Sequence, residues 1–249
     1  MVNSKKRVFV VTMLFGANLA AVCWGQGSVQ PQWTAYTTSK VRPEMRRKFE
    51  AYIKELSAAY KKAGVLWFHS FETFAGDATE FITIVPVMKF GDLDGPLAVE
   101  RVVGKAQWKH FSNRIARCYT SQTCQYATPH AESEINKTAA PSGAYWIETR
   151  ILAAPGKLND YLIWLRDDYR PALEKAGVVR FQVSQPVFGA VAGEIVTTRM
   201  LNRLADIDLG PVLTKALNDE EARAMAAKSV AFVTSSSTRI LRLRSDLSY

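Results

Sequence analysis

The sequence predicts an α+β fold made of two tandem copies of one β-α-β-β-α-β unit. The chain has 249 residues, of which 48% are apolar and 22% charged, with three cysteines. This composition is typical of a folded protein and excludes a disordered chain or a cysteine-rich scaffold. The chain also repeats itself. Lys61–Val65 (KKAGV) matches Glu174–Val178 (EKAGV), and Phe74–Pro96 matches Phe188–Pro211 with a single one-residue gap.

The first 25 residues are predicted to be a signal peptide. Lys5, Lys6 and Arg7 form a basic start, and Val8–Val22 follows without a charge. This length is typical of a signal-peptide core and short for a membrane span, which needs about 20 apolar residues. An uncleaved N-terminal anchor is the alternative. We expect a periplasmic or secreted protein with no membrane span after the leader, whose removal lowers the net charge from +9 to +6.

Two units and a linker account for the rest of the chain. The first unit is expected over residues 33–135 and the second over 144–249. Residues 136–143 (NKTAAPSG) lie between them and are small and polar, with Pro and Gly, as linkers often are. The sequence indicates no oligomeric state.

Each unit begins with a strand and a helix. Strands rich in Thr and aromatic residues are expected at Trp33–Thr38 and Tyr145–Leu152. A helix should follow each strand, because a proline suits its first turn and a glycine suits its end. These residues are Pro43, Pro155, Gly64 and Gly177.

The second part of each unit supplies three strands around another helix. In the first unit, two strands are expected at Val65–Phe74 and Glu80–Met88. The pairs Gly95-Pro96 and Gly210-Pro211 are predicted to begin the second helix. The last strands are expected near Gln125–Ala131 and Arg239–Leu243. This order is that of the ferredoxin-like split βαβ unit.

One such unit leaves a sheet face uncovered opposite its helices, and two units can bury these faces against each other. This arrangement resembles the dimeric α+β barrel superfamily in its fused tandem form, over nearly all of the chain after the leader. That superfamily includes antibiotic-biosynthesis-type monooxygenases, NIPSNAP-like proteins, EthD-like proteins and haem-handling enzymes. The resemblance rests on element order and duplication, so it implies a fold and leaves the reaction open.

Alternation along each strand predicts which side chains face the interior between the two sheets. The face that carries Phe68 and Phe181 is largely apolar in both copies, so we expect it to pack on the helices. The opposite face should point inward. In the first unit this face carries Tyr36, Thr38, Trp67, His69, Phe71, Thr83 and Val85. In the second unit it carries Glu148, Arg150, Arg180, Gln182, Ser184, Thr197 and Arg199.

This facing suggests an interior that stacks a flat aromatic molecule and holds its anionic end with arginine. We expect His69 or Glu148 to act as a base and Arg180 or Arg199 to stabilise an anion, as in a cofactor-independent monooxygenase. The remaining ligand-binding residues would be Tyr36, Trp67, Phe71, Arg150 and Gln182. The alternative is a non-catalytic binding or assembly module whose interior is filled by aromatic packing and structural ion pairs. The sequence leaves open whether the protein is an enzyme.

Other motifs are mostly absent. No HExxH, CxxC, GxSxG, Walker loop or GxGxxG occurs, so we expect no metal site and no cofactor, and no basic arm indicates nucleic-acid binding. Haem ligation by His69 or His110 is a less favoured alternative. Cys118 and Cys124 are expected to form a disulfide in an oxidising compartment, and two free thiols are the alternative.

Overall fold

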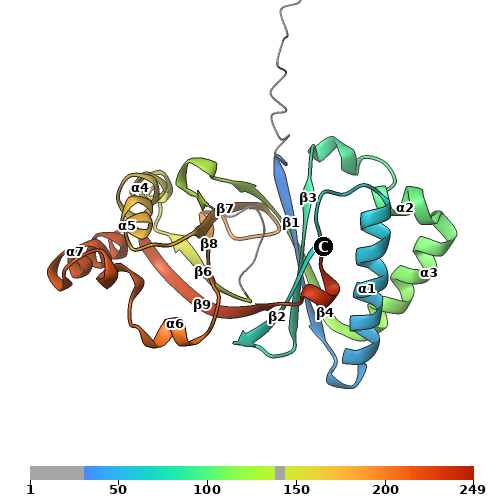
Figure 1. Cartoon of the computed structure of the whole chain (residues 1–249). Coiled ribbons are helices and arrows are strands. Elements are labelled where there is room, and N and C mark those ends of the chain that lie inside the picture. The colour runs from blue at the N-terminus through green and yellow to red at the C-terminus, as the bar shows by residue number, and fades with distance from the viewer. Residues whose placement is uncertain (1–30, 138–143) are drawn as a thin grey trace, which may run out of the picture. The chain divides into compact units, whose positions relative to one another are not determined.

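A computed structural model describes residues 31–137 and 144–249 (Figure 1). The predicted signal peptide and most of the predicted linker lie outside the described residues. Pro31–Tyr249 forms one compact unit. None of the helices in the described part of the chain combines the length and the apolar character that a membrane crossing requires.

The first half follows the predicted order. Its elements are β1 (Trp33–Val41), α1 (Arg46–Lys62), β2 (His69–Ala75), β3 (Glu80–Val87), α2 (Ala98–Val103), α3 (Lys105–Ile115), β4 (Tyr119–Pro129) and a two-residue strand β5 (Ile135–Asn136). Pro43 begins a short 3₁₀ turn that leads into α1. Gly64, after α1, has φ = +76°, a left-handed conformation that glycine adopts easily. The predicted first helix and its ends are therefore confirmed.

The second half repeats this order, but it lacks a counterpart of β5 and its helices differ. Its elements are β6 (Tyr145–Ala153), α4 (Leu158–Trp164), α5 (Arg170–Lys175), β7 (Arg180–Phe188), β8 (Glu194–Leu201), α6 (Ala205–Asp208), α7 (Asp219–Val230) and β9 (Val233–Leu243). A π-helical turn, Leu165–Tyr169, joins α4 to α5. Gly210-Pro211 does not begin the long second helix. Asn218 caps α7 instead, because its side chain accepts a hydrogen bond from the Glu221 N–H while the Glu221 carboxylate accepts one from the Asn218 N–H.

The strands of the described residues form one antiparallel sheet that closes on itself. The strand order is β4-β1-β3-β2-β9-β6-β8-β7-β5, and β4 also pairs with β7, so eight strands make a barrel. The two halves are joined by the β2–β9 and β4–β7 pairings. Helices α1 to α3 pack on the first half of the sheet and α4, α5 and α7 on the second (Figure 1). The predicted α+β barrel of two ferredoxin-like units is confirmed.

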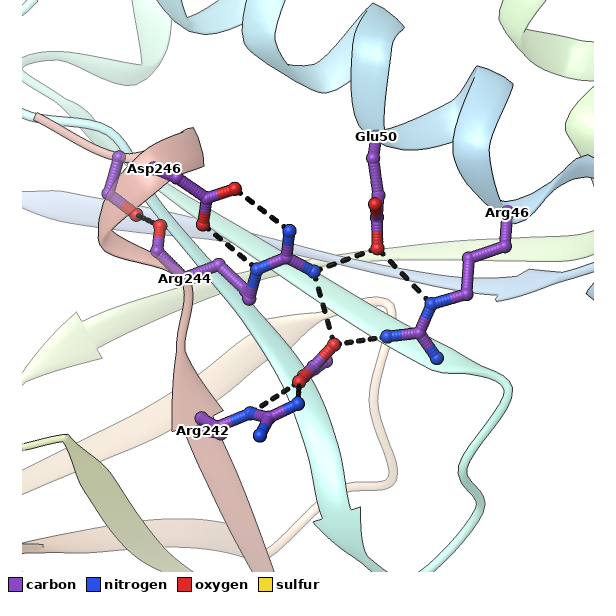
Figure 2. Close-up of polar contacts among 7 residues, drawn as sticks. Arg46, Glu50, Arg242, Arg244 and Asp246 are labelled. Carbon is purple, nitrogen blue, oxygen red and sulfur yellow. Dashed lines mark hydrogen bonds and ion pairs between the residues drawn. The ribbon is translucent and has the colours of Figure 1, made fainter.

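A buried carboxylate holds α1 and the end of the chain to the barrel at the β2–β9 junction (Figure 2). The Glu72 side chain of β2 is 4% exposed and pairs with Arg46 of α1 and with Arg242 and Arg244 at the end of β9. Arg244 also pairs with Glu50 of α1 at 2.8 Å. The junction between the halves thus combines backbone pairing with charged side chains from three elements.

Candidate functional site

The pairing register decides which side chains of the first half enter the barrel. His69 of β2 pairs with Ile84 of β3, and residues that face each other across a strand pair lie on the same face of the sheet. Ile84 therefore points inward, and its neighbours Thr83 and Val85 point toward the helices. The prediction that Thr83 and Val85 face the interior is wrong, because a shift of one residue exchanges the two faces.

The same correction applies to β8. Arg199 pairs with Phe181, which belongs to the core between the sheet and the helices of the second half. Thr197 lies on that face too, where it lines a cavity beside Tyr169. The prediction that Thr197 and Arg199 face the interior is therefore wrong. Burial lowers the pKa of Arg199, with a smaller opposing effect from Tyr169.

The other predicted aromatic residues do gather in the interior. Tyr36 and Trp67 pack against a buried apolar cluster that includes Phe71 and Trp146, whose ring centres lie 4.6 Å apart. The imidazole of His69 stacks on the Trp67 indole with ring centres 4.9 Å apart. Aromatic side chains therefore occupy this part of the barrel interior.

A network of ion pairs occupies another part of the interior. The Glu148 carboxylate accepts hydrogen bonds from Arg150 Nε at 2.9 Å and from Arg239 Nε at 2.8 Å. Arg239 also pairs with Glu80, and Arg150 with Glu194, both at 2.7 Å. The Glu148 side chain is 1% exposed, so the geometry favours a structural role for this predicted base. Sequence reasoning missed Glu80 and Arg239, because the partners of Arg239 lie on other strands.

A large cavity lies on the helix side of the first half, not between the sheets. It has a volume of about 630 Å³. Its floor is formed by alternate residues of β1, β3 and β4, and its roof by α1 and α3. The floor includes Ala35, Thr37, Ser39, Thr83, Val85, Gln122, Cys124 and Tyr126. The roof includes Ile53, Leu56, Tyr60, Trp108, Phe111 and Ile115. We call this space the helix-side cavity.

A polar strip crosses the floor of the helix-side cavity, beside the apolar Ala35 and Val85. Gln122 Nε2 donates a hydrogen bond of 2.9 Å to Ser39 Oγ, and Tyr119 Oη donates one of 3.2 Å to Gln122 Oε1. Thr37 Oγ1 lies 3.7 Å from Cys124 Sγ, to which it donates a hydrogen bond. Hydroxyl, amide and thiol groups thus line one side of a space whose opposite wall is aliphatic and aromatic.

A charged group and a neutral phenol complete the lining. Arg101 is the one cationic side chain among the cavity-lining residues of the described chain, and its Nη1 donates to the Pro96 carbonyl at 2.8 Å. Burial raises the pKa of Tyr60 to about 12, so its hydroxyl stays protonated at neutral pH. The cavity therefore offers hydrogen-bond donors and a cation, and the exposed Asp92 supplies one carboxylate to its lining.

The predicted disulfide is absent. Cys118 is fully buried beside Phe111 and Ile115 in the helix-side core, whereas Cys124 is exposed, and both thiols are free. A strand rises about 3.3 Å per residue, so the six residues from Cys118 to Cys124 along β4 span about 20 Å. The Cα atoms of bonded cysteines lie about 5.5 Å apart. The extended strand therefore excludes the bond.

A histidine-ligated haem does not fit the cavities of the described residues. His110 is exposed on α3, and His69 lies in the barrel interior, where burial and, to a smaller extent, Arg180 lower its pKa to about 4. His130 contacts Glu132 and Gln185, each at 3.2 Å. No histidine lines the helix-side cavity. Over residues 31–137 and 144–249, no cluster of three or more His, Cys, Asp or Glu residues is suited to a metal ion.

Comparison with known proteins identifies the fold. No protein-family profile and no curated protein matches the sequence. A putative monooxygenase from Lactobacillus acidophilus matches with a TM-score of 0.60 and 9% identity, over 86% of this chain and 94% of that chain. An anthrone oxidase-like protein matches with a TM-score of 0.60 and 14% identity, over 87% and 93%. A mutant chlorite dismutase from Candidatus Nitrospira defluvii matches with a TM-score of 0.57 and 11% identity, over 87% and 93%. At these identities the likeness shows the dimeric α+β barrel fold alone.

Proposed function

We propose that the helix-side cavity binds a small, largely apolar aromatic molecule with a polar edge. The observation that carries this proposal is a cavity of about 630 Å³ with apolar walls and one polar strip. Ligand cavities typically measure about 300–1,000 Å³ and combine apolar walls with a few polar groups. Trp108, stacked with Phe111 at 5.7 Å between ring centres, supplies a flat surface on the roof. Ser39 and Gln122 would orient a hydroxyl or carbonyl group on the floor.

The finer part of the proposal is a cofactor-independent oxygenation of that molecule. Proteins with this fold include a putative monooxygenase and an anthrone oxidase-like protein, which motivates this reaction class. The substrate itself would supply the electrons: an activated CH2 group would become C=O with one atom of O2, and the other atom would leave as water with the two hydrogens. The chain would orient the substrate and exclude water with the apolar roof, while Arg101 would attract an anionic substituent. The predicted leader places this reaction in the periplasm or outside the cell. The mass of the mature protein tests whether the leader is removed.

Binding can be tested with paired probes and a matched control. We expect 1-naphthol to quench tryptophan fluorescence, and Leu56→Trp, which fills the roof, to weaken binding at least tenfold. Ile163→Trp serves as the control, because Ile163 is 42% exposed on α4 and lies outside the cavity. Gln122→Leu should weaken the binding of 1-naphthol more than that of naphthalene, since only 1-naphthol has a hydroxyl group. Equal binding by wild type and Leu56→Trp would contradict the proposed site.

Turnover is a separate measurement on the same variants. Oxygen uptake with anthrone should exceed the rate without protein and should fall in Leu56→Trp but not in Ile163→Trp. Binding without oxygen uptake would leave a ligand-binding module, which is the non-catalytic alternative.

A further inference from the structure

Three arginines of the described residues point into the barrel, and one of them differs from the others. Arg150 and Arg239 each pair with two carboxylates at 2.7–2.9 Å. Gln182 of β7 and the inward-facing Glu148 of β6 both pair with Thr198, so Gln182 also faces inward. Arg180 lies two residues before Gln182 and shares its face. No carboxylate of the described residues lies within 4.0 Å of its guanidinium, and its buried Nε has no hydrogen-bond partner there. Arg180 is thus an interior cation without a counterion among these residues.

The surroundings of Arg180 do not supply that counterion. Burial is the main cause that lowers the pKa of Arg180, and the charge of Glu134 opposes this effect only partly. Burial in turn raises the pKa of Glu134, which favours its neutral form. An isolated buried charge is strongly unfavourable, and buried charges in proteins are usually paired with an opposite charge.

The groups around Arg180 form a flat surface beside this cation. The positive charge of Arg180 contributes to the lowered pKa of His69. The His69 ring lies nearly parallel to the Trp67 indole, with an angle of 14° between the planes. Across the barrel, Tyr36 Oη lies 3.4 Å from Ser184 Oγ, on the same face of β7 as Arg180. Trp67, His69 and Arg180 are each only partly buried, so solvent reaches them.

We propose that Arg180 binds the carboxylate of a small flat molecule whose ring packs against the Trp67–His69 pair. The planar guanidinium matches a carboxylate with two parallel hydrogen bonds, and the stacked rings offer an apolar face for an aromatic body. This site lies on the opposite face of the sheet from the helix-side cavity, so it stands independently of the function proposed there.

The corrected register supplies a matched control for the test. Arg199 is also a partly buried arginine whose pKa is lowered by burial, but it faces the helices. We expect 2-naphthoate to bind wild type in calorimetry and to shift the imidazole NMR signals of His69. Arg180→Met should weaken this binding at least tenfold, and Arg199→Met should leave it within twofold of wild type.

Two further variants keep the proposal testable if Arg180→Met fails to fold. Arg180→Lys retains the charge without the planar fork and should still weaken 2-naphthoate binding. Trp67→Leu should weaken the binding of 2-naphthoate more than that of acetate, because only 2-naphthoate has a ring to stack. Absence of binding to wild type at millimolar 2-naphthoate would overturn the proposal. So would equal losses in the Arg180 and Arg199 variants, or inorganic phosphate that binds as tightly as 2-naphthoate.

Discussion

Replacing Glu72 by Gln removes the charge at the centre of the junction between the halves. The Glu72 side chain is 4% exposed and faces three arginines. Removing one partner of a buried ion pair costs about 3–5 kcal/mol, because it leaves the other charge uncompensated. Two of the arginines, Arg46 and Arg244, retain Glu50 as a partner. We therefore expect the low end of the range, about 3 kcal/mol, and a fall in Tm of about 6–12 °C for a domain of this size.

The same arginine provides an internal comparison. Arg244 contacts Glu72, Glu50 and Asp246, whose side chains are 4%, 24% and 58% exposed. Solvent screens exposed ion pairs, which are worth about 0.2–1 kcal/mol. Glu50→Gln should therefore cost about 1 kcal/mol, and Asp246→Asn about 0.5 kcal/mol or less. The loss of stability should follow burial and not the number of hydrogen bonds.

Urea unfolding measures this series directly. All three variants should keep the wild-type m-value and shift only the midpoint, because the same surface is exposed on unfolding. Salt at about 1 M should diminish the Asp246→Asn effect and spare most of the Glu72→Gln effect, since buried pairs are poorly screened. Equal losses across the series, or a loss below about 1 kcal/mol for Glu72→Gln, would refute the reasoning from burial.

Three further predictions concern pH, thiols and the second junction. Burial lowers the pKa of His69 to about 4 from its ordinary value of about 6.5. As the pH falls, the unfolded chain thus takes up the proton first. The contribution of neutral His69 to the free energy of unfolding is therefore fully present above pH 6.5 and is lost as the pH falls toward 4. His69→Gln should remove about 1 kcal/mol per pH unit of this slope, measured by urea midpoints. In the native protein a thiol reagent should label Cys124 and spare the buried Cys118, as mapped by mass spectrometry; labelling of both without urea would contradict the structure. Gly189→Ala should lower Tm markedly, because its Cβ would lie 2.2 Å from the Cys124 carbonyl oxygen, whereas Gly95→Ala meets no atom within 4 Å.

The duplication made the topology predictable, but not the register. KKAGV and EKAGV place the end of the first helix in both copies, and a proline and a glycine mark its limits. Which face a strand residue occupies depends on its partner across the sheet. That pairing placed Tyr36 and His69 inward as expected and turned Val85 and Arg199 outward. A tertiary pairing that can shift by one residue is not encoded in the alternation of a single strand.

The helix-side cavity could not be predicted for a related reason. Its floor residues, such as Thr37 and Thr83, look like ordinary strand residues, and a gap beneath a helix depends on how that helix packs. Nothing in the sequence indicated that Cys118 belongs to the core. Two nearby cysteines favour a disulfide until the extended strand between them is known. The start of α7 is different, because Asn218 and Glu221 form a capping pattern that was visible in the sequence.

A single inserted residue helps to explain why the two halves offer different cavities. Gly64 follows Pro43 by 21 positions, whereas Gly177 follows Pro155 by 22. An extra residue within a helix is commonly absorbed as a π-helical turn, and the second copy has one at Leu165–Tyr169.

Aromatic rings in and beside that turn occupy the space beneath the helix. Trp164 and Tyr169, stacked with ring centres 5.0 Å apart, line a cavity of about 350 Å³ on the helix side of the second half. In the first half, Leu56 and Tyr60 of an uninterrupted α1 cover the larger cavity of about 630 Å³. The π-helical turn thus accompanies a smaller helix-side cavity in the second half. Ligand binding on the helix side should accordingly depend on first-half substitutions far more than on those at the equivalent places of the second half.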